Sequence, residues 1–303
     1  MSNHPVIAFI GFGEAAQAFV KGWKSEGVTL RILAYDILLD DRAAAPTKRA
    51  ECVALGVQVA ASAVEAAKEA DLVICAVTAD QVIAAAESIL PAARAGLTFL
   101  DINSAAPFRK TAAAAPLAEK GVAVVDVAVM QPVYPKLHKT PLLISGPGAA
   151  SVAPVLAALG MEAEVVSDAL GDASIVKMVR SIAIKGIESV VMECMTAAVK
   201  FGVADRVVPT ISDYLANKTF ATLANHVMER VVVHGGRRAA EMREVVATME
   251  AAGLSSYMPA ATAAHQQWVT DLNLKSRFGG PVPKDGRAIA AALLLRLSSR
   301  QAS

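Results

Sequence analysis

The feature that most constrains this fold is a glycine-containing turn between a short apolar run and a helical pattern. The run Val6–Ile10 leads into Gly11-Phe-Gly13-Glu-Ala-Ala16, and the helical pattern continues to about Ser25. Gly11 would allow a tight turn, Gly13 would let the backbone approach a pyrophosphate, and Ala16 would permit close packing of helix on strand. The free N–H groups at the helix start would hold the phosphates. The alternative is an ordinary glycine turn of an α/β protein.

The remainder of the first half alternates short apolar runs with alanine-rich helical segments. This alternation predicts parallel strands with helical crossovers, which form a doubly wound sheet. Near-continuous apolar strands are typical of a sheet that is covered on both faces. The further runs are Leu30–Tyr35, Leu72–Val77, Leu97–Ile102, Val122–Val129 and Leu142–Ser145.

The second half has no such runs and is expected to be all helical. Asp172–Lys200 has the pattern of one long helix, apolar on most of its circumference, so we expect it to be buried on more than one side. Further helices follow, and Gly235-Gly236 is expected to punctuate them. The sequence therefore predicts an α/β protein with a Rossmann domain over residues 1–167 and a helical domain over residues 168–303, joined by the long interdomain helix.

Charge and cysteine content exclude several classes of function. The formal net charge is +1 and no dense basic cluster is visible, so nucleic acid is not an expected partner. The cysteines are widely spaced and no histidine pair has ligand spacing, so we expect no disulfide framework and no metal. The first residues lack the layout of a signal peptide. These features are typical of a cytoplasmic protein. The cysteines are Cys52, Cys75 and Cys194.

One uncharged stretch, Thr140–Met161, is long enough to suggest a membrane span. It contains residues that would break a helix repeatedly, namely Pro141, Gly146, Pro147, Gly148 and Pro154. We therefore expect a strand, a turn and a short helix there, and no membrane association.

An acidic residue completes the predicted dinucleotide site. Asp36 ends the second apolar run, and its carboxylate can accept hydrogen bonds from the ribose hydroxyls while repelling a 2′-phosphate, which favours NAD over NADP. Arg42, Lys48 and Arg49 lie nearby and can accommodate a phosphate, so NADP stays open. The alternative for Asp36 is a solvated aspartate at a strand end. The predicted cofactor-binding residues are Gly11, Phe12, Gly13, Glu14, Ala15, Asp36, Val77, Thr78 and Asn103.

With these motifs in place, the whole chain resembles the β-hydroxyacid dehydrogenase superfamily, which includes 6-phosphogluconate and 3-hydroxyisobutyrate dehydrogenases. Those proteins join a Rossmann domain to a helical domain through a long helix, and their catalytic lysine lies near its start. The stretches that carry the resemblance are Gly171-Asp-Ala-Ser-Ile-Val-Lys177-Met-Val-Arg180-Ser181, Asp101-Ile-Asn-Ser104-Ala-Ala-Pro107 and Asp126-Val-Ala-Val-Met-Gln-Pro132.

The resemblance implies that Lys177 is the catalytic lysine and that Ser104 lies near nicotinamide and substrate. The chain departs from the family at several positions. Ser181 stands where an amide side chain is usual, Arg180 where the phosphogluconate enzymes have histidine, and the loop at Met130 lacks its paired glycines. The nearest match is a bacterial subgroup with a distinct C-terminal domain. Fold and hydride chemistry transfer from the family, whereas the substrate does not.

Oxidation of a secondary alcohol needs a base for the hydroxyl proton and an acceptor for the hydride, which NAD supplies. Lys177 is the expected acid–base group, and burial beside Arg180 would lower the pKa of its ammonium. The alternative is a surface lysine. We expect an NAD(P)-dependent oxidoreductase acting on a small anionic hydroxy or keto acid. The predicted substrate-binding residues are Ser104, Met130, Arg180, Ser181 and Arg238.

Two other functions are kept as alternatives. An imine reductase is related in fold, but most members lack the lysine, so Lys177 argues against it. A non-catalytic nucleotide sensor would need neither the lysine nor polar residues in the cleft. The apolar helix also predicts a homodimer, with Val176–Val199 central to the contact and the C-terminal domain contributing, because a helix that is apolar on most faces leaves too large a surface for a stable monomer. The resemblance implies the same, since those families pack this helix across a dimer interface.

Overall fold

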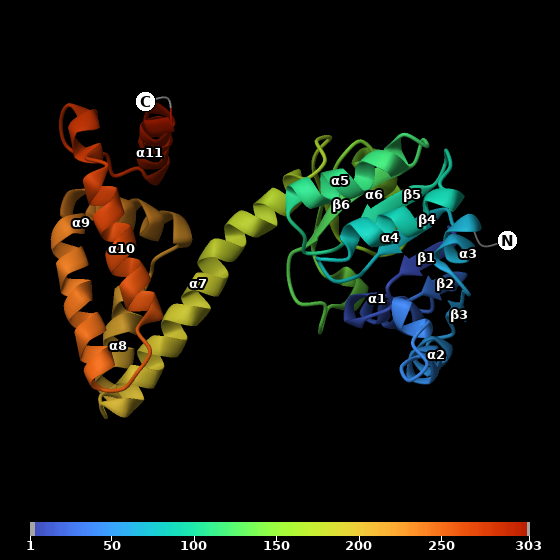
Figure 1. Cartoon of the computed structure of the whole chain (residues 1–303), viewed down its shortest axis with the longest axis horizontal. Helices are drawn as coiled ribbons and strands as arrows, with labels where there is room; N and C mark the ends of the chain where they lie inside the picture. The colour runs from blue at the N-terminus through green and yellow to red at the C-terminus, as the bar shows by residue number, and fades with distance from the viewer. Residues whose placement is uncertain (1–3, 302–303) are drawn as a thin grey trace. The chain divides into compact units, whose positions relative to one another are not determined.

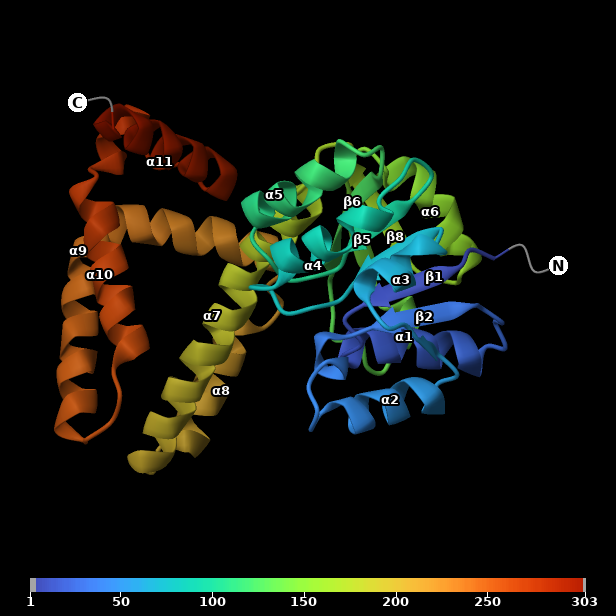
Figure 2. The same cartoon turned by 45° about the vertical axis from the view of Figure 1, so that its right-hand side comes forward.

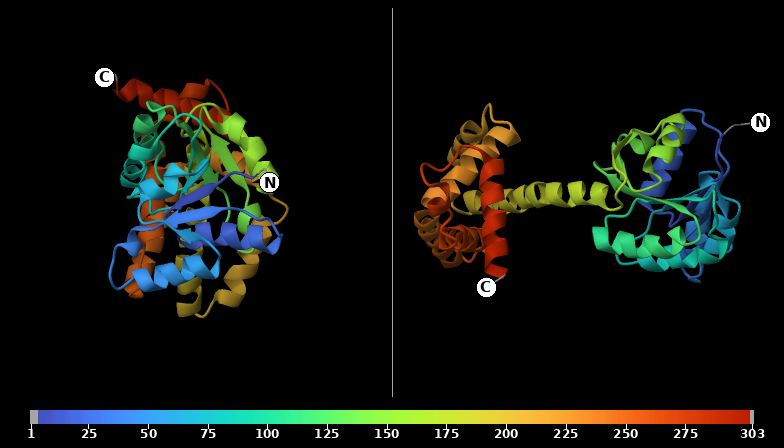
Figure 3. Two further views of the ribbon diagram at one scale, coloured as in Figure 1. Left: turned by 90° about the vertical axis from the view of Figure 1, so that its right-hand side faces the viewer. Right: turned by 90° about the horizontal axis from the view of Figure 1, so that it is seen from above.

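The structure, a computed structural model, describes residues 4–301 and divides the chain into two units. The first unit extends to Ile182, and the second begins at Ala183. The helix α7 (Asp172–Lys200) begins in the first unit and continues without a break into the second (Figure 3). The predicted interdomain helix is confirmed with these bounds.

The first unit is built on an eight-stranded sheet (Figure 1), with strand order β3-β2-β1-β4-β5-β6-β7-β8. The chain crosses from β3 on one side of β1 to β4 on the other, so the sheet is doubly wound as predicted. The strands are β1 (Ile7–Ile10), β2 (Ile32–Tyr35), β3 (Gln58–Val59), β4 (Leu72–Cys75), β5 (Thr98–Asp101), β6 (Ala123–Val129), β7 (Leu142–Ser145) and β8 (Ala163–Ser167).

Helices cover both faces of this sheet and create two cores. On β1, Ile7 and Phe9 enter one core while Ala8 and Ile10 enter the other, as the two-residue alternation of a strand requires. The first core contains side chains of α1, α2 and α6, and the second contains side chains of α3, α4 and α5. The helices flank the sheet in Figure 2. The helices are α1 (Glu14–Ser25), α2 (Ala45–Ala54), α3 (Ala63–Lys68), α4 (Val82–Ser88), α5 (Pro107–Ala118) and α6 (Ala149–Ala158).

Two strands, β7 and β8, run opposite to the other six, because β7 pairs antiparallel with β6 and β8 pairs parallel with β7. The alternation of runs predicts parallel strands throughout, but β7 pairs antiparallel with β6, with Val127 opposite Ile144. The segment between these two strands contains only a short 3₁₀ turn, Leu137–Lys139, and not a crossover helix. A connection of this kind returns the chain alongside the strand it has just left, so the two strands are antiparallel.

The stretch that had suggested a membrane span folds as expected, into β7, a turn and α6. Pro154 lies within α6. Within residues 4–301, every helix is too short or too polar to span a lipid bilayer.

The second unit is helical, which confirms the predicted class. Its helices after α7 are α8 (Ala204–Leu215), α9 (Phe220–Ala251), α10 (Tyr257–Asp271) and α11 (Gly286–Gln301). The expectation that Gly235-Gly236 interrupts the helices is wrong, since both lie inside the continuous α9. A Cβ atom on Gly235 would lie 2.6 Å from Oγ1 of Thr270 and 2.9 Å from the carbonyl oxygen of Gln266. The glycine therefore permits close packing of α9 on α10.

The apolar surface of α7 also differs from expectation. We predicted burial on more than one side, but in the single chain many of its large apolar side chains are exposed. Val179 is 61% exposed, Ile182 75% and Met192 70%. The first turn differs, because Ala173 and Ser174 are buried against the sheet, and Ala198 is buried near the other end of the helix. The apolar pattern of α7 is therefore not explained by packing within one chain.

Candidate functional site

The glycine turn has the geometry that the sequence predicts. Gly11 has φ +84°, and a Cβ atom there would overlap the backbone carbonyl of Ala76. Gly13 precedes α1 with extended φ and ψ, and a Cβ atom there would meet nothing within 4 Å. Open space at Gly13 leaves the first turn of α1 accessible to an anion. The side chain of Phe12 is buried against Phe9, so it is not available to a ligand.

Asp36 lies at the end of β2 beside this turn and is 9% exposed. Its Oδ2 accepts a hydrogen bond from the N–H of Phe12 at 2.7 Å, and Oδ1 accepts one from Leu38 at 3.0 Å. A carboxylate offers about four lone-pair sites, so two remain for a ligand. Lys48 is committed elsewhere: its Nζ donates to the carbonyl of Phe12 at 3.1 Å and to Glu51 at 2.6 Å.

A second group of predicted residues joins the carboxyl ends of β4 and β5. Oδ1 of Asn103 accepts from the N–H of Val77 at 2.6 Å, and its Nδ2 donates to Oδ1 of Asp101 at 2.7 Å. Burial raises the pKa of the Asp101 carboxyl, and the nearby Lys110 opposes this shift. Thr78 is exposed in the same loop as Val77. Ligands of open α/β sheets bind beyond the carboxyl ends of the strands, where these loops lie.

Lys177 reaches the loop after β5 from the second turn of α7. Its Nζ donates a hydrogen bond to Oγ of Ser104 at 2.7 Å, so the structure brings together the two residues that the resemblance singles out. Ser181 is turned to its own helix, because its Oγ donates to the carbonyl of Lys177 at 2.8 Å. Arg180 is exposed, and Met130 is half-buried after β6.

A buried charged pair in the same unit was not among the residues predicted for the site. Lys110 of α5 is 2% exposed and Asp126 of β6 is fully buried, and their Nζ and Oδ1 atoms are 2.8 Å apart. One signal was available: Asp126 interrupts the apolar run of β6, and a charge inside a strand covered on both faces requires a partner.

The second unit contains Arg238, half-buried in α9, whose Nε is buried and has no hydrogen-bond partner within residues 4–301. Its neighbour Arg237 forms an ion pair with Glu241 one turn later. An apolar cavity of about 340 Å³ lies among α7, α8, α9 and α10 in this unit, and Cys194 and Met249 are among its lining residues.

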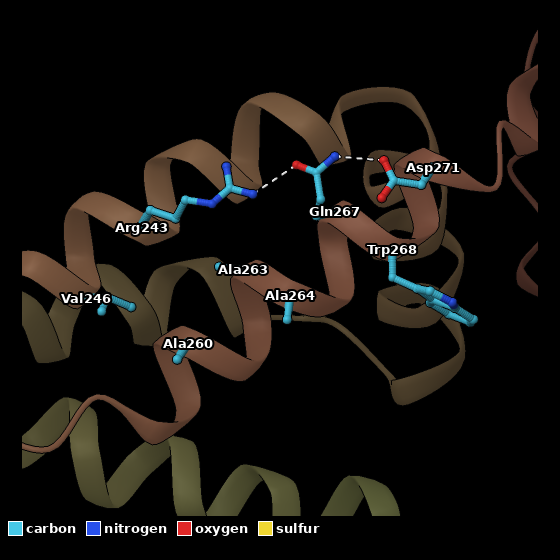
Figure 4. A pocket seen from close by; sticks show the side chains of 8 residues that line it. All are labelled: Arg243, Val246, Ala260, Ala263, Ala264, Gln267, Trp268 and Asp271. Atoms are coloured by element: carbon cyan, nitrogen blue, oxygen red, sulfur yellow. Dashed lines mark hydrogen bonds between the residues drawn. The ribbon is translucent and has the colours of Figure 1, made fainter.

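A further hollow of about 500 Å³ lies along α9 and α10 (Figure 4). Its polar side chains bond to one another: Arg243 donates to Gln267 at 3.0 Å, and Gln267 donates to Asp271 at 2.9 Å. It contains none of the residues predicted for the site.

Comparison with known proteins gives two family matches and several solved structures. Residues 6–105 match a family described as NADP oxidoreductase, coenzyme F420-dependent, and residues 198–269 match a domain of unknown function, DUF1932. A conserved hypothetical protein from Sinorhizobium meliloti is 33% identical, with 97% of each chain covered and a TM-score of 0.60.

Two further structures extend the comparison. A conserved protein of unknown function, described as structurally similar to 3-hydroxyacid dehydrogenases, is 28% identical over 88% of this chain and 96% of its own, with a TM-score of 0.57. An imine reductase from Streptomyces aurantiacus is 20% identical over 96% and 99% of the chains, with a TM-score of 0.71, and shows likeness of fold.

Fold and matches together define the class: the chain is of the NAD(P)-dependent oxidoreductase family, with a Rossmann unit followed by a helical unit. Within that class, the chain belongs to the β-hydroxyacid dehydrogenase superfamily.

Proposed function

We propose that this protein is an NAD-dependent dehydrogenase of small, anionic hydroxy acids and that Lys177 is its general acid–base group. The observation that carries the proposal is the 2.7 Å hydrogen bond between Nζ of Lys177 and Oγ of Ser104. Two polar side chains from separate elements meet beyond the strand ends, where a substrate hydroxyl can contact both. A neutral Lys177 would take the hydroxyl proton during oxidation and return it during reduction.

The residues around the glycine turn fit a dinucleotide. The open space at Gly13 suits a pyrophosphate at the start of α1, and Asp36 retains acceptor sites for two ribose hydroxyls. When bound, the nicotinamide supplies the hydride acceptor. A preference for NAD over NADP is supported by Asp36 and by Lys48, whose ammonium is held by Glu51 and is not free to meet a 2′-phosphate.

An anionic substrate is proposed on the basis of Arg180. It follows Lys177 by three residues on α7, so the two side chains share a helix face, and its exposed guanidinium can hold a carboxylate through two parallel hydrogen bonds. Replacement by alanine should raise the KM for the acid with little change in kcat. An unchanged KM would move the carboxylate to another group, of which Arg238 is the next prediction from sequence.

Turnover of NAD and NADP with a panel of short hydroxy acids tests the proposal, with cyclic imines and NADH or NADPH as the second arm. An imine reductase is the second candidate because such an enzyme shares this fold with a TM-score of 0.71. Oxidation of at least one hydroxy acid, lost in Lys177→Ala, is the expected result. Reduction of imines alone would replace the proposal with the second candidate, and binding without any turnover would favour a sensor.

We also propose that the protein is a homodimer. Its α7 exposes large apolar side chains along Val176–Val199, and stable monomers rarely expose contiguous apolar surface of this kind. A second copy of the same helix is the proposed cover. Light scattering should give twice the chain mass, and Ile182→Glu should halve it. Val53→Glu is the matched control, since Val53 is 71% exposed on α2. A wild-type monomer at micromolar concentration contradicts this proposal.

A further inference from the structure

The buried pair of Lys110 and Asp126 plays no part in the chemistry proposed above. Besides the 2.8 Å contact with Asp126, Nζ of Lys110 donates to the backbone carbonyls of Asp101 at 2.9 Å and Val127 at 3.1 Å. Burial of two charges costs free energy that their attraction repays only when the geometry is good. An apolar pair would fill the same space, so the ions call for a separate explanation.

The carboxylate of Asp126 accepts hydrogen bonds from the first turn of α7 and so caps its N-terminal end. Its Oδ2 accepts the N–H of Ser174 at 2.9 Å, and its Oδ1 accepts the hydroxyl of Ser174 at 2.7 Å. The adjacent N–H, that of Ala173, donates to Oγ of Ser145 at 3.0 Å, and this hydroxyl donates to Oδ2 of Asp126 at 3.3 Å. First-turn N–H groups have no partner within a helix, and a negative charge is favourable at that end. Two strands of the sheet therefore hold the start of α7.

Lys110 connects the same point to the other half of the site. The carbonyl that it binds belongs to Asp101, the last residue of β5, and Ser104 follows three residues later. On α7, Lys177 follows Ser174 by three residues and Ala173 by four, so it lies on the anchored face of the helix. Both partners of the contact between Lys177 and Ser104 are thus tied to one buried ion pair.

We propose that Lys110 and Asp126 are positioning residues that set the distance between Lys177 and Ser104. Asp126 fixes the start of α7 and hence Lys177, while Lys110 fixes the end of β5 and hence Ser104. The catalytic consequence rests on the function proposed above, but the geometric claim does not. Displacement of a catalytic group by about 1 Å can reduce a rate by about 10²-fold, so loss of the pair should lower kcat by roughly that factor.

Three variants separate positioning from simple stability. Asp126→Asn removes the charge, and Ser174→Ala removes one of the hydrogen bonds to it. Lys110→Met with Asp126→Leu removes the ion pair and leaves the buried carboxyl of Asp101, whose Oδ1 lies 3.7 Å from Nζ of Lys110, without that neighbour. Trp23→Phe is the matched control: Trp23 is buried in the same unit, and the change removes the hydrogen bond from its Nε1 to the carbonyl of Leu159 at 2.9 Å. For each protein, kcat, the KM for the cofactor and Tm are measured.

In Asp126→Asn we expect kcat to fall by about 10²-fold and the KM for the cofactor to stay unchanged. Ser174→Ala should show a smaller fall in kcat. In the double variant kcat should be low as well, since the pair then anchors neither the start of α7 nor the end of β5. A wild-type kcat in Asp126→Asn or in the double variant, or a kcat that falls equally in Trp23→Phe, overturns the proposal.

A crystal structure of the double variant tests the geometry without any activity. The proposal requires Nζ of Lys177 to lie beyond hydrogen-bond distance of Oγ of Ser104, and an intact contact overturns it. If the double variant does not crystallise, the structure of Ser174→Ala serves, with a displaced first turn of α7 as the required result. If the wild type has no dehydrogenase activity but Lys177 is displaced in the variant, the proposed function is wrong and the positioning role is retained.

Discussion

The two glycines of the nucleotide turn should respond in opposite ways to the same change. In Gly11→Ala the new Cβ overlaps the carbonyl of Ala76, and φ of +84° is unfavourable for alanine. The backbone conformation costs about 1–2 kcal/mol. Forcing a Cβ atom into packed backbone adds about 1–3 kcal/mol, so the free energy of unfolding should fall by about 2–5 kcal/mol.

Gly13→Ala should leave stability nearly unchanged, since its Cβ meets nothing within 4 Å and its φ of −87° suits alanine. Its effect should fall on the cofactor, because the methyl group projects into the space proposed for the pyrophosphate. Loss of one hydrogen bond to a charged group costs about 1.5–3 kcal/mol, which corresponds to a roughly 10- to 100-fold weaker Kd.

Urea unfolding without cofactor and calorimetric titration with NAD measure the two effects separately. Gly13→Ala should have the wild-type unfolding midpoint and a raised Kd, whereas Gly11→Ala should have a lowered midpoint. Wild-type affinity in Gly13→Ala would refute the placement of the pyrophosphate at the start of α1. A loss of stability equal to that of Gly11→Ala would refute the reasoning from φ and packing.

Two further predictions concern single side chains. Asp36→Ala should weaken NAD more than NADP, measured as kcat/KM for each, and a wild type that uses NADP at least tenfold better would contradict the assignment. Burial lowers the pKa of His138, against the opposing charge of Glu26 and aided by Lys139. The unfolded chain therefore protonates this histidine at a higher pH than the folded protein does. The contribution of neutral His138 to stability is complete above about pH 6.5 and is lost as the pH falls below it. The free energy of unfolding should fall there by at most about 1.4 kcal/mol per pH unit. His138→Leu should reduce this slope in urea titrations at pH 5–7, and an unchanged slope would exclude His138 as its source.

The sequence was sufficient where a residue type is required by local geometry. Gly11 and Gly13 predicted the turn between β1 and α1, and the 3.6-residue pattern predicted α7 with its observed bounds. Strand direction was harder to predict, because an apolar run such as Leu142–Ser145 has the same pattern whether the strand is parallel or antiparallel to its neighbour. Its antiparallel pairing depends on a connection without a helix. β3 has only two residues, too few to show a pattern.

The candidate site was predictable in part for the same reason. Asp36, Lys177 and Ser104 occur in recognisable local motifs, and the structure brings the last two together. The pairing of Asp126 with Lys110 joins residues of different elements, and no local pattern specifies it. The exposure of Ile182 and its neighbours also departs from expectation, since an apolar helix face reads the same whether it is covered by its own chain or by another.

The central claim is that Lys177 transfers the substrate proton. Replacement by alanine should lower kcat by about 10²- to 10⁴-fold, the usual contribution of general acid–base catalysis. Lys177→Arg should not restore the rate, because a guanidinium keeps its proton at working pH.

The most direct measurement is kcat of wild type and Lys177→Ala on the same hydroxy acid, with the Kd for NAD determined in parallel. We expect the large fall in kcat with an unchanged Kd, because the residues proposed to bind the dinucleotide, Gly13 and Asp36, lie elsewhere in the unit. Near-wild-type turnover in Lys177→Ala with intact NAD binding would contradict the account.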